Sequence, residues 1–171
     1  MGMAFRIDPP AVVPSIGEVR LSGRVMGQLG ASEQLVVWVF RETASAADEA
    51  SADRLNRGFR LAFGPRLMGA AACGFDGLRR CLAADPTRAP RFCPLRCACL
   101  SFDEDTLLHA LAAAQLGDRS LHRTLTDRFV GEAGRLQFWR QSRLLAEVLG
   151  RADLLLPDIR LVELPADAPR H

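Results

Sequence analysis

Three cysteines, Cys93, Cys97 and Cys99, lie within seven residues of one another in a stretch that precedes an expected helix. Thiolates are soft ligands, and a structural zinc takes four such groups in a tetrahedron. The fourth ligand would be Cys81, from the preceding helix, or His109, two turns into the following one. The spacing C-x3-C-x-C matches neither the usual C-x2-C zinc motif nor a standard iron–sulfur pattern. We define residues 91–99 as the cysteine turn, and it is the candidate metal site, with zinc or iron as the expected ion.

Two other interpretations of the cysteine turn stay open. Cysteine is among the most readily buried side chains, so the thiols would simply pack in the core. Alternatively, one thiol is a redox group. In that case Arg91, Arg96 and the amide end of the helix at Ser101 would lower its pKa and make it reactive.

Catalytic signatures are weak. The chain has three histidines, His109, His122 and His171, so a nucleophile–histidine dyad would pair Cys97 or Cys99 with His109 or His122. The sequence contains no glycine-rich phosphate loop ending in lysine, no H-E-x-x-H motif and no dinucleotide fingerprint after a strand. The sequence therefore favours a non-enzymatic protein, and because enzymes without these motifs exist, it leaves the question of activity open.

Basic residues gather in the middle of the chain. All 22 are arginines, and residues 54–100 hold nine of them against two acids. Such a segment favours a nucleic acid or another anionic partner, or else its arginines are the solvated faces of two helices. The candidate residues for nucleic-acid binding are Arg54, Arg57, Arg60, Arg66, Arg79, Arg80, Arg88, Arg91 and Arg96.

Length and composition indicate one globular domain. A chain of 171 residues with 49% hydrophobic and 25% charged residues can bury a core of its own. Its longest apolar run, Leu35 to Phe40, is too short to span a membrane, and the N-terminus has no secretory pattern. Five cysteines without an export signal fit reduced thiols or metal ligands in a cytoplasm. We expect a cytoplasmic protein with no membrane partner.

The periodicity of apolar residues predicts an all-α fold, a single domain of about six helices. The helical domain covers residues 32–152. An extended N-terminal arm (1–31) and an extended C-terminal strip and tail (153–171) flank it, with short edge strands in these arms. The six expected helices are 32–50, 51–63, 65–84, 101–116, 118–130 and 132–149.

Local signals support these elements. Leu35–Phe40 is ambiguous between helix and strand, and we favour helix because Ser32 resembles an N-cap and an alanine-rich stretch follows. Ser101 and Glu104 form a capping box, so the acidic residues 103–105 suit the positive end of a helix dipole. Gly117 and Gly150 are expected to end helices, and residues 18–25 alternate as an edge strand does. In the helix 65–84, three glycines suggest close approach by a neighbouring helix: Gly69, Gly74 and Gly77.

Residues 32–156 resemble a group of small bacterial helical proteins that are rich in alanine, leucine and arginine and have no assigned function. The residues that carry the resemblance are Cys97-Ala-Cys99-Leu-Ser-Phe-Asp-Glu104 and the following helix, Leu107 to Leu116, which ends in Ala-Ala-Ala-Gln115-Leu-Gly-Asp118. The resemblance implies a helical fold and brings no activity with it.

A full core without a catalytic set predicts a non-enzymatic cytoplasmic accessory or protein-interaction domain. Its apolar arms would dock on a protein partner or on a second copy of the chain. The first alternative is a small metal-binding regulator built on Cys93, Cys97 and Cys99. The second is a nucleic-acid binder that uses its arginines, whose affinity would fall steeply with salt.

Overall fold

The computed structural model describes residues 19–45, 48–85 and 89–157, so most of the predicted N-terminal arm and the tail after Pro157 lie outside the described residues. The described part is mostly helical, as predicted, and none of its helices is long and apolar enough to cross a membrane. Its elements are β1 (Leu21–Val25), η2 (Met26–Gln28), α1 (Ala31–Ser45), α2 (Glu49–Ala83), β2 (Cys99–Ser101), α3 (Phe102–Leu116), α4 (Arg119–Thr126), η4 (Glu132–Gly134) and α5 (Arg135–Arg151).

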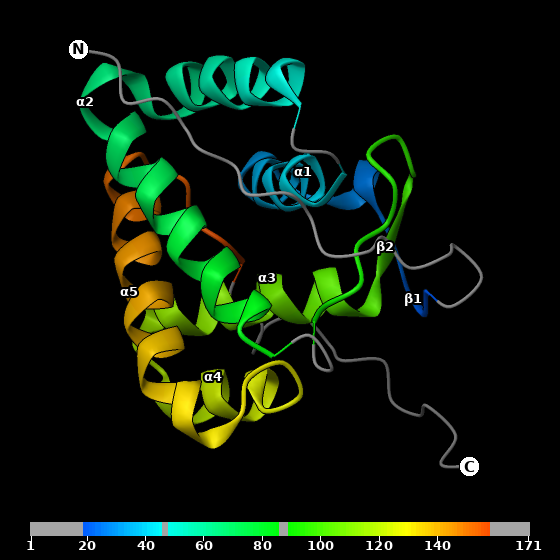
Figure 1. Cartoon of the computed structure of the whole chain (residues 1–171), viewed down its shortest axis with the longest axis vertical. Helices are drawn as coiled ribbons and strands as arrows, with labels where there is room; N and C mark the ends of the chain where they lie inside the picture. Colours follow the sequence, from blue (N-terminus) through cyan, green and yellow to red (C-terminus); the bar gives the residue numbers. More distant parts are fainter. Residues whose placement is uncertain (1–18, 46–47, 86–88, 158–171) are drawn as a thin grey trace.

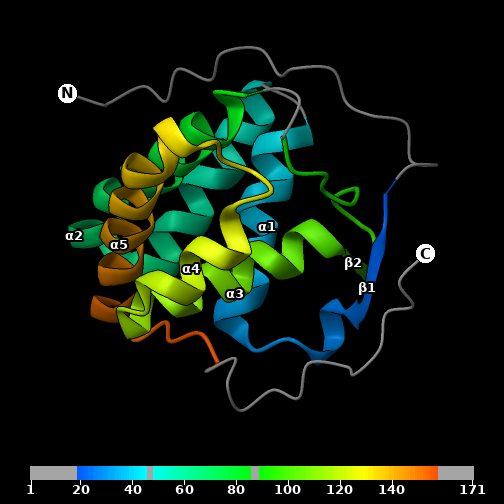
Figure 2. The same ribbon diagram turned by 90° about the horizontal axis from the view of Figure 1, so that it is seen from below.

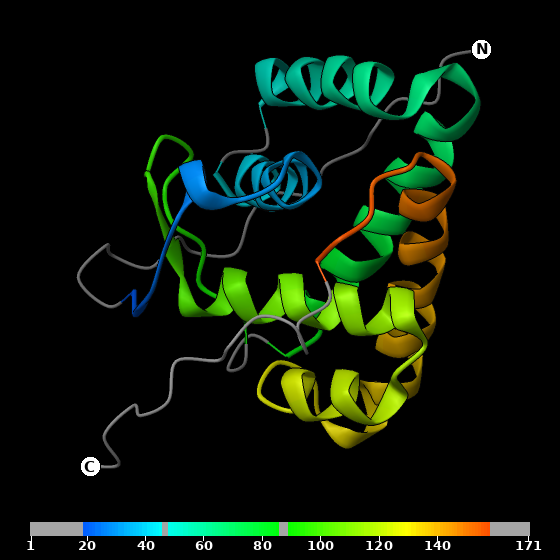
Figure 3. The ribbon, with the colours of Figure 1, turned by 180° about the vertical axis from the view of Figure 1, so that it is seen from behind.

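The long helix α2 is bent at Gly64, and the bend gives it two packing partners. Gly64 has φ 63° and ψ 174°, a conformation that glycine adopts at little cost, and Pro65 follows it. The first half of α2 lies next to α1, whereas the second half runs beside α5 (Figures 1 and 3). The predicted helices 51–63 and 65–84 are these two halves.

Glycines let α2 and α5 approach closely. A Cβ atom at Gly74 would lie 3.2 Å from Cδ1 of Leu145, and one at Gly77 would collide with the side chain of Gln141. A Cβ atom at Gly69 would meet open space. The prediction of a close helix contact is confirmed at Gly74 and Gly77, and it is wrong at Gly69.

Helix α1 contains the ambiguous apolar run, and the choice of helix is confirmed. Val36, Val37 and Val39 are buried, because this helix packs between the first half of α2 and α3 (Figure 1). The helix begins at Ala31, one residue before Ser32, so Ser32 as the N-cap is wrong. Instead, the Gly30 N–H donates to the Glu33 carboxylate at 2.9 Å.

The hydrophobic core contains a continuous run of phenyl rings. Phe92 stacks on Phe40 at 5.6 Å between ring centroids, and Phe40 meets Phe75 edge-on at 5.8 Å. Phe75 stacks on Phe59, which contacts Phe63. Aromatic pairs at these distances stabilise a core beyond their buried area. The run connects the cysteine turn, at Phe92, to the bend of α2, at Phe63.

A two-stranded antiparallel ribbon closes one side of the molecule (Figure 2). Leu21 pairs with Ser101 and Val25 with Cys99, with an irregularity of register between them. The predicted edge strand is thus confirmed as β1. Its partner, β2, includes the last residue of the cysteine turn, a segment that we expected to be irregular.

The ends of the last three helices agree only in part with the sequence. The capping box of Ser101 and Glu104 is present at the start of α3, and Gly117 ends α3 with φ 75°. Asp118 caps α4, which ends at Thr126, earlier than predicted. The helix predicted from residue 132 is first a 3-10 turn, η4, and Gly150 lies within α5, so these two boundaries are wrong.

Candidate functional site

The cysteine turn is a tight loop between the end of α2 and β2. Its backbone reverses at Pro94–Cys97, where the Cys97 N–H donates to the Pro94 carbonyl at 2.9 Å. Cys93 is 4% exposed, whereas Cys97 and Cys99 are half-buried. A loop of this kind leaves carbonyl groups without partners in regular structure, so other groups must satisfy them.

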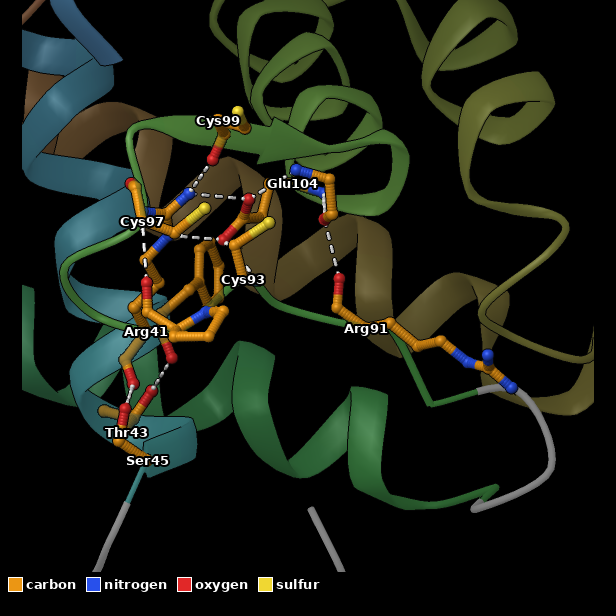
Figure 4. A network of polar contacts seen from close by, with 11 residues as sticks. Arg41, Thr43, Ser45, Arg91, Cys93, Cys97, Cys99 and Glu104 are labelled. Carbon is orange, nitrogen blue, oxygen red and sulfur yellow. Dashed lines mark hydrogen bonds and ion pairs between the residues drawn. The ribbon is translucent and has the colours of Figure 1, made fainter. Parts of the chain in front are cut away.

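Arg41 of α1 satisfies these carbonyls from the inside of the molecule (Figure 4). Its side chain is 1% exposed. Nη1 donates to the Cys97 carbonyl at 2.6 Å and Nη2 to the Cys99 carbonyl at 2.6 Å. Nε and Nη2 donate to the two carboxylate oxygens of Glu104, at 2.6 and 3.0 Å. The rigid guanidinium fork matches a carboxylate in this bidentate geometry.

Glu104 completes the arrangement with its remaining acceptor capacity. Oε1 accepts the Cys93 N–H at 3.1 Å, and Oε2 accepts the Ser101 N–H at 2.7 Å as part of the capping box. Burial lowers the pKa of Arg41, but the hydrogen bonds and the charge of Glu104 outweigh it, so this pKa is raised. The Arg41–Glu104 pair therefore joins α1, the cysteine turn and α3 through one buried ion pair.

The neighbouring acids of α3 also have partners. Asp103 accepts the Arg91 N–H at 2.8 Å and pairs with Arg128 at 2.6 Å. Asp105 pairs with Arg24 at 2.7 Å. We expected the acidic residues 103–105 to be explained by the helix dipole, and the structure adds an arginine partner to each of them.

The Cys97 side chain lies close enough to the Cys93 thiol to act on its pKa. Burial raises the pKa of Cys93, and the nearby charge of Glu104 and the Cys97 side chain raise it further, to about 12, although Arg41 opposes them. The redox interpretation expected Arg91 and Arg96 to lower a thiol pKa. For Cys93 the cation that acts is Arg41, and the shift is upward.

The structure brings together only part of the predicted metal set. Within residues 19–45, 48–85 and 89–157, no three side chains of His, Cys, Asp or Glu form a group that could hold a metal ion. Cys81 is half-buried in α2. His109 lies against Asp105, with 4.0 Å between Nε2 and Oδ1, in a cavity of about 10 Å³ that Arg24 and Glu33 also line. Zinc or iron at the cysteine turn stays a prediction, which elemental analysis would test.

Neither histidine of the predicted dyads is placed beside a cysteine by its contacts. His109 faces the Arg24 and Asp105 pair. His122 of α4 is buried, shares a hydrogen bond of 2.9 Å with Ser142 and packs against Trp139 of α5. These contacts are those of a satisfied core histidine.

Sequence reasoning missed Arg41 as the residue that organises the cysteine turn. One signal was available: a charged residue directly after a long apolar run on a helix must either leave the core or find a buried partner there. That partner, Glu104, is separated from Arg41 by 63 positions, so no local pattern connects the two.

Several members of the predicted basic surface form ion pairs. Arg54 pairs with Glu42, and both Arg79 and Arg80 pair with Asp76. Arg57, Arg60, Arg66, Arg91 and Arg96 are exposed, as are the paired Arg54 and Arg80, while Arg88 lies outside the described residues. Part of this charge is therefore balanced within the molecule.

A groove lies at the bend of α2. Its volume is about 600 Å³ and it is open to solvent. Its apolar part comes from Phe63, Pro65 and Leu67, and Arg66 and Arg151 also line it. Both arginines are exposed. The groove thus combines apolar surface with two cations from different helices, α2 and α5.

Comparisons with protein-family models, with curated proteins and with solved structures find no significant match to this chain. The resemblance to small bacterial helical proteins therefore stays a prediction. The function has to be argued from the described residues alone.

Proposed function

We propose that the chain is a non-enzymatic accessory domain that binds a partner protein in the groove at the bend of α2. The observation that carries the proposal is the composition of this groove: an apolar surface next to Arg66 and Arg151. Apolar contact supplies affinity, and exposed cations select an acidic partner and its orientation. The matching ligand is a protein segment with one or two carboxylates beside a large apolar side chain.

The backbone at the groove supports a role in binding. Gly64 departs from helical geometry and Pro65 restarts the helix, so the groove lies where the two halves of α2 meet. Phe63 in the groove wall continues the run of phenyl rings into the core. A groove whose wall is part of a packed core is preorganised, which reduces the entropic cost of binding.

The proposal places the protein in the cytoplasm. All five cysteines are free, and free thiols fit a reducing compartment. A protein partner is favoured over nucleic acid because Arg54, Arg79 and Arg80 of the predicted basic surface are already paired with carboxylates of this chain.

A peptide selection tests the proposal. The purified chain would be screened against displayed random peptides of about 12 residues, long enough to cross a groove in extended form. We expect the enriched peptides to combine Asp or Glu with Leu or Phe. Their affinity, measured by fluorescence anisotropy, should fall by about tenfold or more in the double variant Arg66→Glu/Arg151→Glu.

The matched control is Arg140→Glu, which reverses an exposed arginine of α5 that does not line the groove. This variant should bind the peptides as the unmodified protein does. An equal loss of peptide affinity in the double variant and in Arg140→Glu would show a nonspecific charge effect and would overturn the proposal. Light scattering of the unmodified chain and anisotropy with a labelled DNA duplex distinguish the other outcomes, a homo-oligomer and a nucleic-acid binder.

A further inference from the structure

Cys93 and Cys97 flank the reversal of the cysteine turn, with only three residues between them. The hydrogen bond from the Cys97 N–H to the Pro94 carbonyl closes this turn, and the Cys97 side chain lies close enough to the Cys93 thiol to act on its pKa. Figure 4 shows both side chains beside the Arg41–Glu104 pair. A disulfide needs the two Cα atoms about 4.4–6.8 Å apart, and a closed turn with three residues between the cysteines brings them together in this way.

The buried ion pair holds the backbone of both cysteines. Glu104 accepts the Cys93 N–H, and Arg41 donates to the Cys97 carbonyl. Because Arg41 and Glu104 bind each other, the two cysteines are fixed relative to one common pair. Cys99 also has its carbonyl on Arg41, but Figure 4 shows its side chain directed away from Cys93.

The two thiols differ in exposure, which gives them different roles. Cys93 is 4% exposed, whereas Cys97 is half-buried. A small oxidant in solution therefore reaches the Cys97 thiol before it reaches the buried Cys93 thiol. A half-buried thiol next to a second thiol is the usual arrangement of a redox-sensitive cysteine and its resolving partner.

We propose that Cys93 and Cys97 form a reversible disulfide when a peroxide oxidises the half-buried Cys97. In the first step the Cys97 thiolate attacks one peroxide oxygen, the O–O bond breaks, and the leaving hydroxide takes up the proton lost by Cys97. In the second step Cys93 sulfur attacks the Cys97 sulfenic acid and the S–O bond breaks. The hydroxide that leaves takes the Cys93 proton, so two thiols and one hydrogen peroxide give one disulfide and two waters.

Trypsin provides a direct readout, because Arg96 lies between the two cysteines. Cleavage after Arg91, Arg96 and Arg119 places Cys93 in the peptide 92–96 and Cys97, together with Cys99, in the peptide 97–119. The experiment uses the full chain with Cys73→Ser and Cys81→Ser, treated in its folded state with hydrogen peroxide, alkylated and digested without reductant. We expect mass spectrometry to find the two peptides linked, and the link to disappear after dithiothreitol.

Two further variants assign the second cysteine. With Cys97→Ser the linked peptides should be lost, and with Cys99→Ser they should remain. Circular dichroism verifies that each variant is folded. The same oxidation of unfolded protein in guanidinium should give the pairings Cys93–Cys97, Cys93–Cys99 and Cys97–Cys99 together, which shows whether the fold selects one of them.

Three results would overturn the proposal. The link could survive in the folded Cys97→Ser protein, which would make Cys99 the partner of Cys93. Cys97 could accumulate as sulfinic acid while Cys93 is still alkylated as a free thiol. The folded and unfolded proteins could also give the same mixture of pairings. None of these results bears on the groove at the bend of α2, so the two proposals fail or stand independently.

Discussion

Among the polar residues that the described part of the chain buries, two pairs solve the problem of burial in different ways. Arg41 and Glu104 lie between α1 and α3 as a charged pair with nearly every hydrogen-bonding group in use. His122 and Ser142 lie between α4 and α5 and share one hydrogen bond. Within the described part of the chain no counter-charge offsets desolvation here, and burial lowers the pKa of His122 to about 4. Arg41 and Glu104 stay charged because their charges balance, whereas His122 is neutral.

This difference separates sensitivity to mutation from sensitivity to pH. Removing one member of a balanced pair leaves an uncompensated charge in the core, which costs far more than removing both. A neutral buried histidine instead makes the folded state sensitive to acid, because the unfolded chain can take up a proton that the folded chain refuses. Each of the following variants addresses one side of this comparison.

The largest effect is expected from Arg41→Met. The variant leaves the Glu104 carboxylate without its counter-charge and the carbonyls of Cys97 and Cys99 without their arginine donor. The free energy of unfolding should fall by about 3–5 kcal/mol, as measured by urea denaturation followed by circular dichroism. The cysteine turn should also lose protection against hydrogen exchange before the rest of the core does.

The control for this variant is the double substitution Arg41→Met/Glu104→Leu, which removes both charges. It should recover a large part of the loss, because no unpaired charge remains in the core. If the double variant is less stable than Arg41→Met, the hydrogen bonds to the turn carbonyls outweigh the charge balance. In that case the claim that charge balance stabilises the Arg41–Glu104 pair is wrong.

Acid should weaken the fold through His122. The pKa of His122 is about 4 in the folded state and 6.5 without burial. Its contribution to the free energy of unfolding is therefore complete above pH 6.5 and decreases as the pH falls toward 4. At pH 5 the free energy of unfolding should be about 2 kcal/mol lower than at pH 7.5 from this residue alone. Burial also lowers the pKa of His109, which acts in the same direction. Urea denaturation at a series of pH values measures the sum.

The variant His122→Gln separates the two histidines. Glutamine retains a group that can share a hydrogen bond with Ser142 but takes up no proton. The fall in stability between pH 7.5 and pH 5 should therefore become smaller by about 2 kcal/mol, and the remainder belongs largely to His109. An unchanged pH profile would show that His122 is protonated in the folded state or exposed to water.

Local patterns predicted much of the fold and little of the candidate site. The capping box at Ser101, the helix end at Gly117 and the edge strand β1 follow from neighbours in sequence, and the structure confirms them. By contrast, β2 exists because β1 lies beside it, and a strand of three residues has no periodicity of its own. The Arg41–Glu104 pair connects positions far apart in the chain, so its existence depends on how the helices pack.

The cysteines show the same limit. Their spacing predicted chemistry at residues 93–99, but spacing alone could not tell which thiols face each other. In the structure that selection depends on the hydrogen bond at Pro94 and on the two backbone contacts of the Arg41–Glu104 pair. The contacts to Arg41 and Glu104 are tertiary, and the sequence indicates only that some partner is needed.

The smallest effect is expected from Ser142→Ala, and it tests why His122 is neutral. Loss of the shared hydrogen bond leaves a buried ring nitrogen without this partner, which should lower the free energy of unfolding by about 1 kcal/mol. Thr124→Ala, at an exposed hydroxyl of α4, is the matched control and should cost less than about 0.5 kcal/mol. Because burial is what lowers the pKa of His122, the loss in Ser142→Ala should be the same at pH 7.5 and pH 5. A loss that grows or vanishes at pH 5 would mean that the Ser142 hydroxyl, and not burial, controls the charge of His122. The charge state of both buried pairs would then be set by hydrogen-bonding partners, and the contrast between them would be smaller.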